Sequence, residues 1–495
     1  MALNRRNLLG AAAAGAAVAV VPRGVLGGAG RVPPSEKVHI GYVGCGTQGL
    51  RQLMTALQKP DARIVAVCDP NRRSDDYPQW GPDELNRKVR DFLGDPQWAK
   101  GARGGLCGRE VGRTVVTRHY EKQGQAADCP AYADFREMLD RQKDLNAVYI
   151  MTPDHLHGTI SVRAMRAGKH AVTHKPVANV LAEARLARDT ARQTGAATAL
   201  FCAADKATTP MLCEWIAAGA IGPVREVHNW STRPFWPQGM TRPPADAPPV
   251  PEGLDWDLWL GPVPHRPYHP AYTHAVFRGW YDFGTGALGD MGHYSFYQVF
   301  RILKLGCPLS VEAGRSQYWS ITDFTWHKEV NQVSYPQASM IRWEFAARGD
   351  MPPLSLTWYD GGLRPPTPPE LDADGAALPA EGLLLVGDGG KILAGFTGDN
   401  PRLIPAARMR DFKPPAPALP RPIDELDQFL RACKGGLPSD ACFENVYPFA
   451  ETILLGAVAL RVEKKLSWDT AKMAFSNSPE ANALLRRKYR EGWEL

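Results

Sequence analysis

The spacing of hydrophobic residues changes along the chain and divides it into two parts. From Lys37 to Phe201, short apolar runs alternate with segments in which apolar residues recur every three or four positions. This alternation predicts a parallel sheet with helices on both faces. The first strand is expected at residues 38–43, and the helix after it carries an apolar stripe of Leu50, Leu53, Met54 and Leu57.

Three further strands are predicted in the first part, at residues 64–68, 147–151 and 171–173. Each of them ends at a polar segment, and ligands of open parallel sheets bind at the ends of the strands. Residues 71–130 interrupt the alternation with polar, glycine-rich sequence. We expect an inserted surface excursion there, with one helix near residues 83–93.

Beyond Pro210 the pattern changes. A strand is predicted at residues 224–231, a segment rich in proline and tryptophan comes after it, and a helix is predicted at residues 290–303. Later strands are expected to form one antiparallel sheet, at residues 339–345, 354–359, 383–386 and 392–396.

Two C-terminal helices, at residues 424–433 and 447–461, are expected to pack back on the first domain. The predicted fold class is thus α/β and α+β. A Rossmann-type doubly wound parallel sheet occupies residues 37–205, and a C-terminal domain with an open, mainly antiparallel sheet occupies residues 206–495.

The N-terminus has the features of a twin-arginine signal peptide over residues 1–30. Arg5 and Arg6 are paired, and an uncharged apolar run over residues 8–21 comes next. The run is too short to span a bilayer, and an ordinary secretory signal or an amphipathic N-terminus is the alternative. We expect a periplasmic protein that meets the twin-arginine translocase during export. Since that route carries folded proteins, a bound cofactor can travel with the chain.

Composition excludes some partners. The 495 residues are 44% hydrophobic and 22% charged, which is ordinary for a globular protein. The net charge is +6, and the predicted leader carries three arginines and no acid, which leaves +3 for the remainder. Basic and acidic residues are interspersed, so no nucleic-acid partner is expected. Nine cysteines without a CxxC pattern predict free thiols in place of a disulfide framework.

A glycine-rich segment at residues 44–49 predicts a dinucleotide site. It contains Gly44, Gly46 and Gly49, with Thr47 and Gln48 between them, in the turn from the first strand to the first helix. Main-chain amides at such a turn can approach a pyrophosphate. Asp69 ends the next strand, and its carboxylate is expected to bind the adenosine ribose and to favour NAD. NADP stays possible because Arg72 and Arg73 are close by in the sequence.

Four further segments, TPDHLHG (152–158), AGKHAVTHKP (167–176), WDLWLGP (256–262) and RGWYDFGTGALGDMGHY (278–294), occur in an order and spacing that resemble the Gfo/Idh/MocA oxidoreductases. The likeness runs from Lys37 to Leu495 and is greatest to the exported, sugar-acting bacterial branch. It implies a nucleotide domain followed by an α/β domain whose open sheet forms one wall of the substrate pocket. It also implies a homo-oligomer, a dimer or a tetramer.

The resemblance assigns the chemistry to Lys175, which matches the lysine that contacts the hydroxyl being oxidised in that family. A lysine acts as a base only when it is neutral, and burial and a positive nicotinamide ring both favour the neutral amine. His174 stands where the family usually has glutamate. With that carboxylate missing, we expect Lys175 to lose its proton more easily; a purely structural lysine is the alternative.

Asp290, His293 and Tyr294 form a second group, because offsets of three and four place them on one face of the predicted helix. Asp290 is expected to cap that helix or to bind substrate. Either His293 or Tyr294 transfers a proton: His293 is favoured by its ordinary pKa, whereas Tyr294 is the positional match to the family. Capping and packing are the alternative roles.

Histidines and aromatic residues complete the predicted site. His155 and His157 form an HxH pattern, but no third ligand stands at a recognisable spacing, so we expect no metal. Contacts to cofactor or substrate are predicted instead, with Thr152 and Pro153 shaping the loop and His174 beside the cofactor. Substrate contacts are predicted for Trp230, Trp280 and Arg278, with core packing and a surface ion pair as the alternatives.

These features favour an exported oxidoreductase that oxidises a secondary hydroxyl of a sugar or glycoside with tightly bound NAD or NADP. A resident cofactor has to be regenerated in place. One route is reduction of a second sugar. Another is a redox-assisted glycoside hydrolase, in which oxidation, elimination, water addition and re-reduction cleave the substrate. A non-catalytic sugar- or nucleotide-binding protein is the alternative from a different class.

Overall fold

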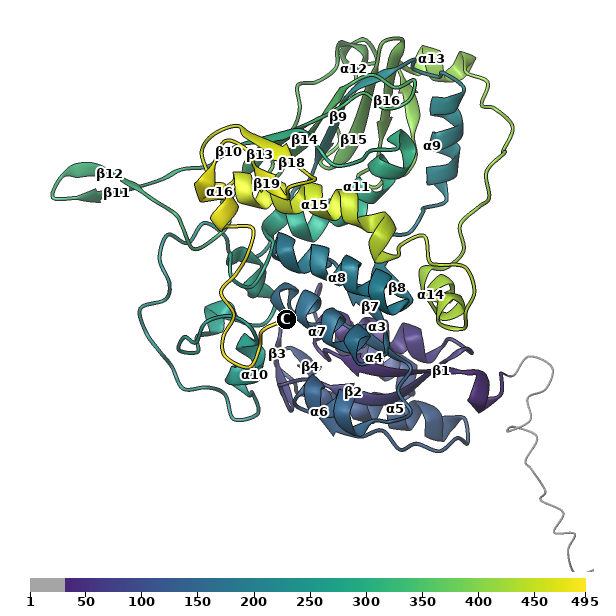
Figure 1. The fold of residues 1–495 in the computed structure, drawn as a ribbon, viewed down its shortest axis with the longest axis vertical. Coiled ribbons are helices and arrows are strands. Elements are labelled where there is room, and N and C mark those ends of the chain that lie inside the picture. The colour runs from purple at the N-terminus through teal and green to yellow at the C-terminus, as the bar shows by residue number, and fades with distance from the viewer. Residues whose placement is uncertain (1–31) are drawn as a thin grey trace, which may run out of the picture.

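Two sheets and the helices between them make up the computed structural model, which describes residues 32–495 (Figure 1). The predicted leader lies outside the described residues. A six-stranded parallel sheet lies near the N-terminus and a nine-stranded mixed sheet lies in the C-terminal half. This arrangement confirms the predicted fold class. Among residues 32–495, no helix combines the length and apolar character needed to cross a membrane. All nine cysteines are free.

The parallel sheet has the order β5-β2-β1-β6-β7-β8. Its strands are β1 (Val38–Val43), β2 (Ala62–Cys68), β5 (Ala131–Tyr132), β6 (Ala147–Ile150), β7 (His170–His174) and β8 (Thr198–Phe201). Because β1 pairs with β2 on one side and β6 on the other, the strand order reverses beside β1, where doubly wound folds bind their ligands. The helices of this domain are α3 (Thr47–Leu57), α5 (Arg109–Lys122), α6 (Phe135–Arg141), α7 (Asp154–Arg166) and α8 (Leu181–Thr194).

The excursion after β2 is shorter than the sequence predicted. A small antiparallel pair, β3 (Ser74–Tyr77) and β4 (Gly105–Cys107), encloses α4 (Glu84–Leu93), which agrees with the one helix expected there. α5 then returns to the parallel sheet, and its Val111, Val115 and Val116 are buried in the core that covers β1 and β2. The sequence did not predict α5 because charged residues and Gly112 dilute its apolar stripe.

The second sheet has the order β17-β16-β15-β9-β14-β13-β10-β18-β19. Only β9 and β14 pair in parallel, so the sheet is mainly antiparallel as predicted. The expected strands correspond to β9 (Val224–Trp230), β13 (Ser339–Phe345), β14 (Leu354–Tyr359), β15 (Gly382–Gly387) and β16 (Gly390–Ala394). The strands that the sequence did not predict are short or lie toward the edges: β10 (Ser310–Arg315), β17 (Arg402–Ile404), β18 (Leu466–Asp469) and β19 (Ala474–Phe475).

Three helices cover the inner face of this sheet or join it to the first domain: α9 (Thr208–Ala217), α11 (Gly286–Leu303) and α15 (Phe443–Ala459). α15 packs against α11 on one side and α8 on the other (Figure 1). α14 (Glu425–Cys433) lies against β8 and contributes Leu426, Phe429 and Leu430 to the core of the first domain. The remaining short helices are α10 (Trp256–Leu260), α12 (Pro369–Ala373), α13 (Ala406–Asp411), α16 (Pro479–Ala483) and three 3-10 turns at Pro34–Glu36, Pro270–Tyr272 and Ala275–Gly279.

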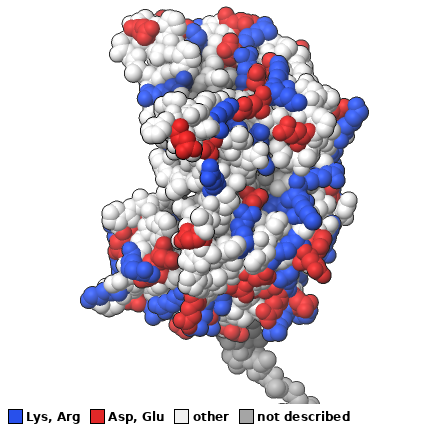
Figure 2. Space-filling view, turned by 90° about the vertical axis from the view of Figure 1, so that its left-hand side faces the viewer, with Lys and Arg blue, Asp and Glu red and all other residues white. Residues whose placement is uncertain are grey.

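A hairpin of β11 (Tyr318–Thr322) and β12 (Thr325–Glu329) projects from the molecule (Figure 1). Its Trp319, Trp326 and Phe324 side chains are exposed. Elsewhere on the surface, Lys and Arg are interspersed with Asp and Glu over the face shown in Figure 2. This distribution agrees with the mixed charges of the sequence.

Candidate active site

The glycine turn between β1 and α3 has the geometry that a pyrophosphate needs. Gly44 has φ +100°, and a Cβ there would lie 2.5 Å from the Met151 carbonyl group. A Cβ on Gly49 would overlap the Gly44 carbonyl oxygen. α3 starts after Gly46 without a side-chain cap, so the amides of its first turn are left for an anion. The residues present therefore fit a dinucleotide.

Asp69 supports this turn from the end of β2. The Cys45 N–H donates to Asp69 Oδ2 (2.7 Å) and the Asn71 N–H donates to Oδ1 (2.8 Å). Burial raises the pKa of the carboxyl group, and the two amide hydrogen bonds oppose that shift. Asp69 thus holds the glycine turn in place, and its contact with a ribose stays a prediction.

The excursion lies over the same turn. The Tyr77 ring sits next to Gly46, where an added Cβ would be 3.1 Å away, and it stacks on His274 with ring centroids 3.5 Å apart. His274 Nε2 also lies 3.1 Å from Asp76 Oδ1. Nearby, the Arg72 N–H donates to the Gly253 carbonyl (2.7 Å). No sequence pattern predicted these contacts, which join the two domains beside the glycine turn.

Lys175, Asp290 and Arg278 come together at the carboxyl end of β7. Lys175 is 3% exposed, and its Nζ donates to Asp290 Oδ1 on α11. Arg278 Nε donates to the same oxygen (2.8 Å). Burial opposes ionisation of Asp290, but the two cations outweigh it and hold the pKa of Asp290 well below its usual range. The cluster is thus a carboxylate held between two cations.

Asp290 does not cap α11, which corrects the sequence interpretation. The helix begins at Gly286, four residues earlier than predicted, and Thr285 occupies the N-cap position. Glycines at 286 and 289 obscured the start because glycine is a poor helix former. Asp290 therefore lies inside the helix, and its side chain is directed to Lys175 and Arg278.

Tyr294 and His293 differ in their relation to this cluster. The Lys175 Nζ lies 5.6 Å from the centre of the Tyr294 ring, and burial raises the pKa of Tyr294, so its hydroxyl stays protonated. His293 is wholly buried, and its Nδ1 lies 2.7 Å from the Gly289 carbonyl. Burial lowers the pKa of His293 to about 3. The ordinary histidine pKa that favoured His293 as the proton-transfer group is therefore lost, whereas the Tyr294 ring lies beside the Lys175 amine.

The histidines of the HxH pattern bond to the main chain. His155 Nε2 lies 2.8 Å from the Trp259 carbonyl, and the two His157 ring nitrogens lie 2.7 and 2.8 Å from the Pro176 and Thr152 carbonyls. Pro153 occupies the N-cap position of α7. Within residues 32–495, no group of three or more metal-ligating side chains occurs. These histidines stabilise the loop between β6 and α7 through hydrogen bonds to main-chain carbonyl groups. Their contact with a cofactor stays a prediction.

The two tryptophans predicted to contact substrate lie in hydrophobic cores. The Trp230 indole N–H donates to the Pro379 carbonyl (2.9 Å) and that of Trp280 donates to the Ala271 carbonyl (2.7 Å). Both rings are buried, so the structure favours the core alternative. Trp236, in the same aromatic segment, is instead half-buried and lies 5.8 Å from the Arg278 guanidinium. It borders the cluster from the loop after β9, as Tyr294 does from α11.

His174 lies directly before Lys175 and stacks on Phe201. Its ring is buried, and burial lowers its pKa well below the ordinary value, so it is neutral. The carboxylate missing at position 174 is replaced, because Asp290 supplies one to Lys175 from α11. An easier loss of the Lys175 proton stays a prediction.

A second carboxylate at position 174 would still favour the charged amine. We predict that His174→Glu moves the midpoint of the pH profile for cofactor reduction upward by about one unit, whereas His174→Gln leaves it in place. Stopped-flow rates measured across the pH range test this. An unchanged profile in His174→Glu would show that position 174 does not influence the lysine.

Comparison with known proteins places both domains in one family. A family model described as an oxidoreductase NAD-binding Rossmann fold matches residues 112–201. The model of the C-terminal alpha/beta domain of the same oxidoreductase family matches residues 224–335 and 371–495. Together these matches cover more than half of the chain.

Similarity to individual proteins is more limited. A dTDP-3,4-didehydro-2,6-dideoxy-alpha-D-glucose 3-reductase of Streptomyces violaceoruber is 36% identical over 126 residues, which are 24% of this chain and 36% of that protein. A glycosyl hydrolase family 109 protein of Saccharopolyspora erythraea is 28% identical over 161 residues, which are 32% of this chain and 27% of that protein. The chain thus spans about a third of the length of these curated relatives.

A solved structure is similar over nearly the whole fold. The aldose-aldose oxidoreductase from Caulobacter crescentus complexed with glycerol has a TM-score of 0.51 at 16% identity, with 87% of this chain and 100% of that chain covered. At this identity the likeness concerns the fold alone. The two family matches, the glycine turn and the buried lysine at the end of β7 agree with one another, and the chain belongs to the Gfo/Idh/MocA oxidoreductase family.

Proposed function

We propose that this protein is an exported oxidoreductase that oxidises a secondary hydroxyl of a sugar or glycoside with a nicotinamide cofactor that stays bound. The observation that carries the proposal is the buried Lys175, whose amine is held by Asp290 and Arg278 at the end of a strand. The glycine turn ends β1 in the same parallel sheet, so both features lie at the same sheet edge. The sugar reductase among the relatives supports the substrate class.

Each side chain of the cluster has its own part in the reaction. Lys175 acts in its neutral form, after it has released to solvent the proton that it carries in the ion pair with Asp290. The neutral amine takes the proton of the substrate hydroxyl, and the ionised Asp290 stabilises the ammonium group that this restores. Arg278 holds Asp290 from its other side. Tyr294 keeps its hydroxyl proton and can hydrogen-bond the substrate oxygen beside the lysine. A bound nicotinamide ring would supply the hydride acceptor.

Retention of the cofactor is supported by the contacts over the glycine turn. Tyr77 with His274, and Arg72 with Gly253, join the excursion to the second domain beside the place predicted for the adenosine. A nucleotide held there leaves only when these contacts open, which favours a resident cofactor during export. NAD is the favoured form because the Asp69 carboxylate would repel a 2'-phosphate. NADP is the alternative, since Arg72 and Arg73 are exposed and line a cavity of about 300 Å³ where they can pair with that phosphate.

A redox-assisted glycoside hydrolase is the second candidate. It is favoured by the family 109 glycosyl hydrolase among the relatives and by Tyr294, which adds a proton donor beside Lys175. Both candidates need the same oxidation step and differ in the fate of the oxidised sugar. Periplasmic location by the twin-arginine route and assembly into a dimer or tetramer belong to the proposal as well.

Mass spectrometry of the small molecules released by denaturing the periplasmic protein tests the proposal. About one NAD or NADP per chain is expected. The intact protein is then mixed with a panel of sugars and glycosides while the absorbance of reduced nicotinamide and free aglycone are recorded. A reduced cofactor supports oxidation, and aglycone without net reduction supports the hydrolase. An empty protein that takes up neither nucleotide, or a panel without spectral or product change, overturns the proposal.

A further inference from the structure

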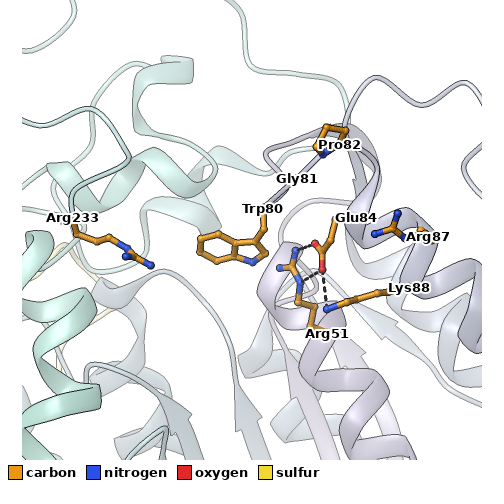
Figure 3. A pocket seen from close by; sticks show the side chains of 8 residues that line it. All are labelled: Arg51, Trp80, Gly81, Pro82, Glu84, Arg87, Lys88 and Arg233. Carbon is orange, nitrogen blue, oxygen red and sulfur yellow. Dashed lines mark hydrogen bonds and ion pairs between the residues drawn. The ribbon is translucent and has the colours of Figure 1, made fainter. Parts of the chain in front are cut away.

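An open cleft of about 700 Å³ lies between the excursion and the second domain (Figure 3). One wall comes from the segment before α4 and from α4 itself, and the other from the loop after β9. The lining residues are Arg51, Trp80, Gly81, Pro82, Glu84, Arg87, Lys88 and Arg233. Neither the glycine turn nor the lysine cluster is among them.

Trp80 is the most prominent side chain of this cleft. It is 65% exposed, and Figure 3 shows its indole reaching toward Arg233 of the facing wall. The Arg51 guanidinium lies 5.5 Å from the ring on the α3 side. The indole thus presents an aromatic face to the cleft with a cation beside it. A flat ring with an apolar face, such as a pyranose, fits against it.

The charge of the cleft is unbalanced. Four cations line it, and Glu84 is the one acid among the lining residues. Glu84 is shared, because it pairs with both Arg51 and Lys88 (Figure 3). Arg233 bonds Glu381 and lies over Phe235. Arg87 is exposed and makes no ion pair within the described residues. The cleft therefore has room and positive charge for an anionic group.

The far wall of the cleft continues to the lysine cluster. Arg233 lies three residues before Trp236, whose ring is 5.8 Å from Arg278, and Arg278 bonds Asp290. Along the other wall, Arg51 donates to the Thr47 carbonyl at the start of α3 (3.2 Å). The loop after β9 thus runs from the cleft to Trp236, which borders the lysine cluster.

We propose that this cleft is a subsite for an acidic sugar unit next to the unit that is oxidised. The ring stacks on Trp80, and a carboxylate or sulfate group pairs with Arg87, the lining cation without an ion pair in the described part of the chain. This inference deepens the proposed function and rests on it, because it takes the unit at Lys175 to be a sugar. It defines the substrate class as an anionic di- or oligosaccharide.

Calorimetry with the reduced holoprotein tests the subsite without turnover, because a reduced nicotinamide cannot accept a hydride from the probe. The probes are a glucuronosyl disaccharide, the same disaccharide with a neutral hydroxymethyl group, and its sulfated form. We expect both acidic probes to bind about tenfold more tightly than the neutral one, with an advantage that shrinks as salt is raised. Trp80→Ala should weaken all three about tenfold, and Arg87→Gln should remove most of the acidic advantage alone.

Two exposed positions provide matched controls. Trp319→Ala on the β11–β12 hairpin and Arg402→Gln on β17 should leave all affinities unchanged. UDP is an additional probe, and tight UDP binding without acidic-sugar binding would overturn the proposal in favour of a nucleotide site. Equal affinity for acidic and neutral probes would also overturn it. If the oxidised protein oxidises neutral glycosides but acidic probes bind with no higher affinity, the subsite is wrong and the proposed reaction is retained. If the probes bind but no sugar reduces the cofactor, the proposed reaction is wrong.

Discussion

Lys175→Met should abolish sugar-dependent cofactor reduction, with kcat lowered by about three orders of magnitude or more. Methionine keeps the apolar part of the side chain but has no group that takes a proton from the substrate hydroxyl. Asp290 retains its bond to Arg278, so the buried carboxylate is still paired and the protein should fold. Single-turnover reduction, followed by the absorbance of the bound nicotinamide, measures the loss.

The matched control is Lys100→Met, at an exposed lysine of the excursion that forms no ion pair within residues 32–495. It should reduce its cofactor at the wild-type rate. The cofactor content of Lys175→Met should equal that of the wild type, since the substitution leaves the glycine turn at residues 44–49 unaltered. Rapid cofactor reduction in Lys175→Met would show that another group takes the proton of the hydroxyl, and Tyr294 would be the first candidate.

Gly49→Ala should leave the protein without its nucleotide, with affinity for NAD lowered by a factor of about 100 or more. The added Cβ would overlap the Gly44 carbonyl oxygen, which belongs to the backbone and cannot move aside as a flexible side chain can. The turn must open, and the amides at the start of α3 lose their common direction. Nucleotide released by denaturation and isothermal titration with NAD measure the effect.

Gly314→Ala in β10 is the control, because a Cβ there meets nothing within 4 Å. It should keep both nucleotide and stability. Circular dichroism and the thermal unfolding midpoint show whether Gly49→Ala still folds. Full nucleotide occupancy in Gly49→Ala would mean that the dinucleotide does not bind at residues 44–49.

Both positions could be identified from sequence because their requirements are local. A glycine turn needs its spacing and the strand before it, and both are visible in residues 38–49. Strands such as β13 and β14 were predicted at their observed bounds because apolar and polar residues alternate along most of each strand. α5, β10 and the C-terminal edge strands were not, because their patterns are short or diluted by charge.

The roles of individual side chains were harder to predict. Trp230 and Trp280 occur among the motifs, yet both are buried, whereas Trp80 and Trp236 are more accessible to solvent. His293 lies next to the cluster in sequence, but burial lowers its pKa to about 3. A sequence shows which residue types are near one another along the chain, and it does not show which of them face water.

The sequence by itself determined the fold class, through the alternation of strand and helix patterns, and the glycine turn, through spacing within a few residues. The role of Lys175 came from the resemblance of its segment to the family motif. Only the tertiary structure decided that Asp290 and Arg278 are the partners of Lys175, and that the excursion bears on the glycine turn. Lys175 and Asp290 are 115 positions apart, and their contact exists only after α11 packs beside β7. The electrostatic environment of that lysine is a property of packing, since the low pKa of Asp290 arises from two cations that the fold brings to one carboxylate.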